Sequence, residues 1–118
     1  MNDKNVVAEF TIIRPSTALA FTPPELQGPE FKDFVKKYYV DTGKILSRQY
    51  SLTEDGLSVT YTTVWKNDEF RKEYSDNFFI KTVMDTATRY RKENNIVTRW
   101  RNREYDGDTL VREWEGDL

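Results

Sequence analysis

The sequence contains no cysteine and no histidine. Without cysteine the chain can form no disulfide, no thiolate metal site and no cysteine nucleophile. Without histidine it lacks the commonest general base near neutral pH and the commonest metal ligand. We therefore expect neither a metal site nor another cofactor, and any catalysis would fall to carboxylates or tyrosines.

Glycine and long apolar runs are also scarce. The five glycines each sit near a predicted turn or element end, so no glycine-rich phosphate loop is present. No apolar run approaches the roughly 20 residues needed to cross a bilayer, and the polar residues 1–5 lack the apolar segment of a signal peptide. The net charge of −2 gives no overall attraction to nucleic acid or anionic membranes. We expect a cytoplasmic protein that binds neither.

Charged and aromatic residues are abundant. They make up 32% and 14% of the 118 residues. A chain of this length forms one domain and buries roughly two thirds of its unfolded surface. The sequence predicts a disordered N-terminus over 1–5 and a single α+β domain over 6–118.

Alternation of apolar residues predicts the strands. It is clearest in 6–14 and in 57–65, where one face of each strand carries a row of apolar or aromatic side chains. These two rows are Val6, Ala8, Phe10 and Ile12, and Leu57, Val59, Tyr61, Thr63 and Trp65. Further strands are predicted over 44–52 and 96–105, and a short fifth strand over 109–114, with turn residues at 53–56 and 106–107.

Two helices follow from apolar positions spaced at three and four residues. The first covers 29–41. The second starts at Asn67, can restart at 75–77 and ends at Asn94–Asn95. Its regular part places six side chains along one side: Ile80, Val83, Met84, Ala87, Tyr90 and Arg91. The intervening loop, 16–28, carries Leu19, Phe21 and Leu26, so it folds over the core edge or covers a partner.

The order strand, helix, strand, strand, helix, strand resembles the ferredoxin-like fold, a two-layer βαββαβ sandwich with strand order 4-1-3-2. The segments Thr63–Phe70 and Tyr90–Ile96 are similar to the dimeric α+β barrel superfamily, including its antibiotic-biosynthesis-monooxygenase-like members. This resemblance implies a homodimer in which two sheets pack face to face. It also implies a pocket between each sheet and its own helices.

The second face of the predicted sheet is partly apolar. Val7, Ile13, Val64 and Val97 lie on it. Pairing would remove this area from water, at about 25 cal/mol per Å². We expect a homodimer, and the alternative is a monomer with a hydrated sheet face.

An aromatic group on the opposite face is the candidate ligand site. Tyr61, Trp65, Tyr90 and Trp100 are predicted to bind a small apolar or aromatic molecule between sheet and helices. The alternative is that these side chains form ordinary core.

Arg99, Arg101 and Arg103 alternate along one strand and share a face. They predict a site for an anion or an acidic partner. The alternative is a cross-strand salt-bridge ladder with Glu9 and with Glu113 or Glu115.

Two functions remain open. The first is non-catalytic binding of a small molecule or protein partner. The second, implied by the resemblance, is a cofactor-independent monooxygenase acting on an aromatic substrate, with Asp85 or a tyrosine as base. A cavity above roughly 300 Å³ with Asp, Tyr or Arg converging on it would favour the enzyme. RNA binding through this topology needs exposed strand aromatics, which the Ser58, Thr60, Thr62 and Val64 face does not supply.

Overall fold

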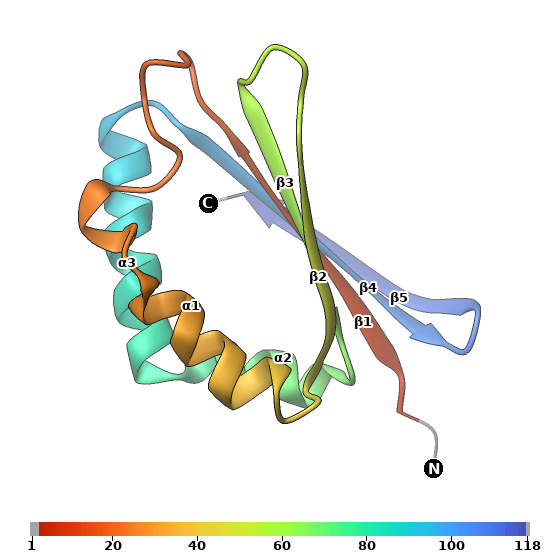
Figure 1. The fold of residues 1–118 in the computed structure, drawn as a ribbon. Helices are drawn as coiled ribbons and strands as arrows, with labels where there is room; N and C mark the ends of the chain where they lie inside the picture. The colour runs from red at the N-terminus through yellow and green to blue at the C-terminus, as the bar shows by residue number, and fades with distance from the viewer. Residues whose placement is uncertain (1–2, 118) are drawn as a thin grey trace.

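The computed structural model describes residues 3–117, which form a twisted sheet with helices on one of its faces (Figure 1). No helix of this described part covers the other face. The α+β class predicted from the sequence is confirmed. None of the described helices is long and apolar enough to cross a membrane.

All strand pairs in the sheet are antiparallel, and the order is β2-β3-β1-β4-β5. The strands are β1 (Asn5–Ile13), β2 (Ile45–Leu52), β3 (Ser58–Trp65), β4 (Val97–Asp106) and β5 (Thr109–Asp117). The predicted order 4-1-3-2 accounts for four of them, and the observed sheet differs by having β5 outside β4. This last strand is also longer than predicted, because its pairing with β4 continues to Arg99 and Asp117.

The helices form a second layer. They are a 3₁₀ turn η1 (Pro24–Leu26), α1 (Pro29–Val35), a π-helical turn η2 (Lys36–Val40), α2 (Asp68–Asp76) and α3 (Phe78–Glu93). The helix predicted over 29–41 is therefore α1 continued by the π turn. The predicted restart at 75–77 is confirmed, because Asn77 ends α2 and its side chain caps α3 by accepting a hydrogen bond from the Ile80 amide at 3.2 Å.

The ends of elements match the turn chemistry of the sequence. Asn95, after α3, has a φ of 58°, the left-handed conformation predicted for it. At the N-terminus the prediction of disorder over 1–5 is wrong for Asn5, which opens β1 and pairs with Tyr105. For Met1 and Asn2 the prediction lies outside the described residues.

The hydrophobic core is divided into two clusters. One contains six buried residues near α1, α2 and the π turn: Val6, Val35, Tyr39, Ile45, Trp65 and Ile80. The other, at the far end of the sheet, contains Ile12, Val59 and Ile96, with Phe10, Phe21 and Tyr90 against it. Phe21 in the loop thus packs on the core edge, one of the two outcomes predicted for that loop.

Candidate ligand-binding cavity

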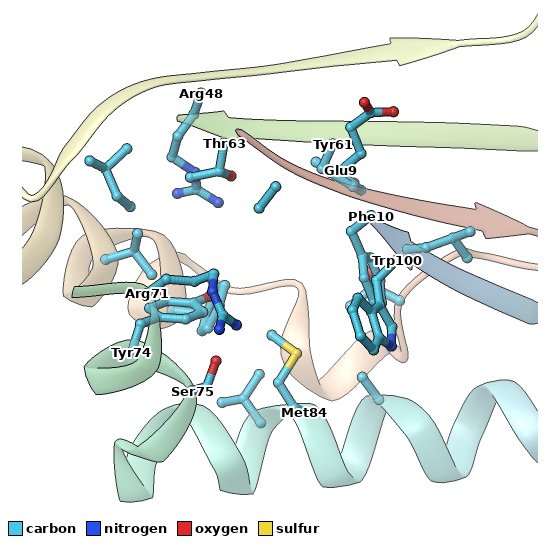
Figure 2. Close-up of a pocket in the computed structure, with 18 of the residues that line it drawn as sticks. Glu9, Phe10, Arg48, Tyr61, Thr63, Arg71, Tyr74, Ser75, Met84 and Trp100 are labelled. Atoms are coloured by element: carbon cyan, nitrogen blue, oxygen red, sulfur yellow. The ribbon is translucent and has the colours of Figure 1, made fainter. Parts of the chain in front are cut away.

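A cavity of about 650 Å³ lies between the helix-facing side of the sheet and the helical layer. Figure 2 shows Phe10 and Trp100 extending from the sheet toward Met84 on α3. On β1 the cavity is bordered by Ala8 and Phe10, which lie between Val6 of one core cluster and Ile12 of the other. The two clusters therefore hold the layers together at the ends, and the middle stays open.

Two cross-strand rows of side chains form the sheet wall of the cavity. One row is small or polar at its centre and consists of Arg48, Thr63, Ala8, Asn102 and Trp114. The next row runs from Tyr50 through Tyr61, Phe10 and Trp100 to Gly116, and its three middle residues, all aromatic, line the cavity. Small side chains such as Ala8 and Thr63 cannot reach the helices across the gap, so their row leaves the space unfilled.

Three of the four aromatic residues predicted to bind a ligand line this cavity: Tyr61, Trp65 and Trp100. Tyr90 is not among the lining residues. Its hydroxyl donates a hydrogen bond to the Ala20 carbonyl at 2.9 Å, and its ring packs on the Ile12 cluster. One residue further along α3, Arg91 lines the cavity instead.

Trp65 belongs to both the core and the cavity wall. Its ring is 5.9 Å from that of Tyr39 and 5.2 Å from that of Tyr74, in edge and tilted arrangements that aromatic pairs favour. Burial raises the pKa of the Tyr74 hydroxyl to about 12. Tyr74 is therefore a neutral phenol at physiological pH and is not a base there.

Arg91 is a buried cation without a carboxylate partner among residues 3–117. Only 7% of it is exposed, and its Nε donates a hydrogen bond to the Phe21 carbonyl at 3.0 Å. Its guanidinium carbon lies 5.7 Å from the centre of the Phe10 ring. Burial lowers the pKa of Arg91, which is the direction expected when a charge loses water without gaining an opposite charge.

Asn102 is the second buried polar group on the wall. It is 7% exposed, and its side chain makes no hydrogen bond within the described chain. No described side-chain N or O atom is fully buried without a partner, so the amide atoms of Asn102 border the cavity space and have free donor and acceptor capacity there.

Two more arginines reach the cavity from opposite layers. Figure 2 shows Arg48 on β2 and Arg71 on α2 both extending into the space. Arg71 is tied to Asp68, since its Nε donates to a carboxylate oxygen at 2.6 Å. Arg112 donates to the other oxygen of the same carboxylate at 3.0 Å. Burial raises the pKa of Asp68, but these two arginines outweigh it and hold the pKa below its usual value.

The three arginines predicted to bind an anion lie on the opposite face of the sheet, and each has a carboxylate of the same chain beside it. Arg101 is 3.1 Å and Arg103 is 3.6 Å from Glu9. Arg103 is also 2.9 Å from Glu113, and Arg99 is 3.9 Å from Asp117. This arrangement is the salt-bridge ladder that was the alternative interpretation.

Acidic groups contribute little to the cavity. Glu9 is the one acidic residue on its described lining, and Figure 2 shows its carboxylate directed away from the helices. The carboxylate lies 3.1 Å from Arg101 of the ladder. Asp85, the candidate base, is exposed and does not line the cavity. Within residues 3–117 no group of three or more acidic side chains is placed to hold a metal ion.

The sequence did contain signals for the two buried polar residues. Arg91 falls on the apolar side of α3 with Met84 and Ala87, and a charge in such a stripe points inward. Asn102 alternates with Arg101 and Arg103, which places it on the same face as Trp100.

Comparison of the chain with protein-family models, with curated proteins and with solved structures finds no match.

Proposed function

We propose that the protein binds a small molecule with an apolar or aromatic body in the cavity between its sheet and helices. The observation that carries this proposal is the cavity itself, about 650 Å³ with walls that include Phe10, Trp100 and Met84. Ligand pockets in proteins commonly measure about 300–1,000 Å³ and have mostly apolar walls with a few polar groups.

The cavity is also accessible from solvent. Tyr61 lines it and is 38% exposed, although it lies on the helix-facing side of the sheet. A core that packs to normal density would bury such a ring. A ligand seated between the layers would cover it and would gain roughly 25 cal/mol for each Å² of apolar surface removed from water.

A cofactor-independent oxygenase is the second candidate. The cavity exceeds the size set above for an enzyme, and arginines and tyrosines converge on it, so a deprotonated phenol or enol could be held there. Such an enzyme also needs a base for the substrate. Tyr74, with a pKa of about 12, holds its proton too tightly, and the Glu9 carboxylate points away. Non-catalytic binding therefore ranks first.

Binding can be tested with N-phenyl-1-naphthylamine, an uncharged probe that fluoresces in apolar sites. We expect saturable binding of one probe per chain. Thr63→Phe, which adds a ring on the cavity wall, should reduce it, whereas Thr62→Phe, on the opposite face of the same strand, should leave it unchanged. Equal effects of the two substitutions, or no saturable binding, would contradict the proposal.

Catalysis can be tested separately with a panel of phenols and quinols and with oxygen uptake as the readout. Turnover that disappears in Thr63→Phe and persists in Thr62→Phe would favour the oxygenase over simple binding. No uptake above the protein-free rate across the panel is the result expected for a binding protein.

We further propose that the chain forms a homodimer through the second face of the sheet. Val7 and Val64 are paired there between β1 and β3, and Val97 on β4 is 45% exposed. The salt-bridge ladder occupies β4 and β5 and includes Glu9 on β1, so the contact would centre on β3 and on Val7 of β1. Sedimentation equilibrium should give twice the chain mass of 14.0 kDa, and Val64→Asp should shift it to the single-chain value.

A further inference from the structure

Arg91 and Asn102 are largely buried residues of the cavity wall whose hydrogen-bonding capacity is not fully used within residues 3–117. No described side-chain N or O atom is fully buried without a partner, so their unused atoms border the open space of the cavity. A buried guanidinium is costly unless a negative charge lies beside it, because removal from water penalises the charged form. Arg91 is 7% exposed and has one hydrogen bond, to a backbone carbonyl. A guanidinium carries five N–H donors, so most of its donor capacity is left over.

The neighbours of Arg91 do not supply the missing charge. Its guanidinium lies near the Phe10 ring, and the groups that interact with it electrostatically are the hydroxyls of Tyr61 and Tyr90. Every ion pair of the described chain uses another cation. Among residues 3–117, therefore, nothing neutralises this charge, although it borders an open cavity.

Asn102 lies on the sheet wall of the same cavity. It sits in the row next to that of Phe10, and its amide makes no side-chain hydrogen bond among the described residues. An amide N–H₂ and a guanidinium together can donate to the oxygens of one anionic group. Apolar side chains border both, so the rest of the ligand would be apolar.

We propose that the ligand is an organic anion, an apolar or aromatic body that carries a carboxylate, and that Arg91 binds this carboxylate with Asn102 as a second donor. This inference rests on the proposed function, since it names the class of molecule that the cavity takes. Lys32, Arg48 and Arg71 are the competing cations of the cavity lining. Lys32 on α1 and Arg48 on an edge strand are exposed to water, and Arg71 is already paired with Asp68. None of them is a buried charge that is unpaired among the described residues, as Arg91 is.

The test compares two displacers of bound N-phenyl-1-naphthylamine at neutral pH, where a carboxyl group with a pKa near 4 is ionised. They are 2-naphthoate and the uncharged 2-acetylnaphthalene, which have similar shapes. We expect 2-naphthoate to displace the probe at concentrations about tenfold lower, because hydrogen bonds to a charged group contribute this much or more.

Arg91→Gln should bring the displacing concentrations of the two compounds, compared within this variant, to within about twofold of each other, since it removes the charge that distinguishes them. Arg48→Gln is the matched control at another cationic position and should keep the preference for 2-naphthoate. If Arg91→Gln disturbs the loop held by the Phe21 carbonyl, Asn102→Leu provides a second variant. It breaks no side-chain hydrogen bond of the described chain and should weaken 2-naphthoate several-fold more than 2-acetylnaphthalene.

The outcomes distinguish a failure of this inference from a failure of the proposed binding function. Absence of probe binding would defeat the proposed function. Probe binding with equal displacement by the two compounds, or with no displacement by 2-naphthoate, would overturn the inference and leave the binding function standing. Loss of the preference in Arg48→Gln and not in Arg91→Gln would overturn the assignment to Arg91.

Discussion

The indole ring of Trp100 lies over Gly116, its cross-strand partner on β5. A methyl group at Gly116 would come within 2.6 Å of the indole Cζ2 atom and 2.8 Å of Cε2. Both distances are far below van der Waals contact. The absence of a side chain at Gly116 thus sets the position of the ring that forms one end of the aromatic row on the cavity wall.

Gly116→Ala should therefore move the Trp100 ring toward the cavity. We expect a shift in the tryptophan emission and weaker binding of the naphthylamine probe, with a modest loss of stability of about 1 kcal/mol from the altered packing. Gly28→Ala is the control for emission and stability, because a methyl group there meets nothing within 4 Å, but it is no control for probe affinity, because Gly28 lines the cavity. Unchanged emission and probe affinity in Gly116→Ala would show that the ring position is not fixed by Gly116.

Asp68 should contribute to stability through its two arginine partners. Its side chain is 10% exposed and accepts hydrogen bonds from Arg71 and Arg112, which join α2 to β5. Asp68→Asn should lower the free energy of unfolding at neutral pH by about 1–3 kcal/mol, because hydrogen bonds to charged groups are lost in a partly buried site. Asp41→Asn, in an ion pair whose side chains are 70% and 53% exposed, should change stability little.

The pH dependence of this effect has a defined sign. The pKa of Asp68 is lowered in the folded protein, below the unfolded value near 4. Its contribution is therefore complete above about pH 4 and is lost as the pH falls through the folded pKa. Urea unfolding of wild type and Asp68→Asn across this range should give a difference that shrinks on acidification, and a constant difference would contradict the assignment.

Ionisation of the buried Tyr74 hydroxyl should destabilise the protein at alkaline pH. Its pKa is raised to about 12 by burial, whereas an unfolded tyrosine ionises near 10. Stability linked to Tyr74 is complete below about pH 10 and is lost as the pH rises toward 12. Tyr74→Phe should lack this loss, and the last step of the tyrosinate absorbance titration should disappear with it.

Asn102→Leu should stabilise the ligand-free protein. Leucine has a similar size, and the substitution removes a buried amide that makes no side-chain hydrogen bond within residues 3–117. A fully buried amide without a partner costs about 1–3 kcal/mol. The amide of Asn102 borders the open cavity and is not fully buried, so the gain should be smaller and the melting temperature should rise slightly. A lower melting temperature would show that the amide has a structural role.

The alternation of side chains predicted the faces of the sheet correctly. Phe10, Tyr61 and Trp65 lie on the helix-facing side, and Arg101 and Arg103 lie on the other, as the period of two requires. Local turn chemistry was equally informative. The side chain of Asn77 caps the start of α3, and Asn95 adopts the left-handed backbone conformation just after its end. These features depend on neighbours in sequence, so the sequence records them directly.

The cavity depends on packing between distant segments, and the sequence did not predict its shape. Aromatic residues at strand spacing are typical of both core and pocket, and the difference lies in whether the opposite layer fills the gap. Here Ala8 in the small row and Ala87 on α3 both line the open space. Packing between distant segments also decides which of two neighbouring helical residues reaches the open space. The sequence therefore predicted Tyr90 as a ligand-binding residue and did not predict Arg91.

The two core clusters lie at the two ends of the cavity and limit its length along β1. Val6 and Ile12 mark its ends on β1, and the six residue steps from one to the other span roughly 20 Å at about 3.3 Å per residue. Both ends are closed by packed side chains, so a rigid molecule longer than this span cannot lie along the strand. It would have to leave through the open side near Tyr61. For the proposed ligand, this span sets an expected upper limit on length, in addition to the proposed preference for charge and aromatic character.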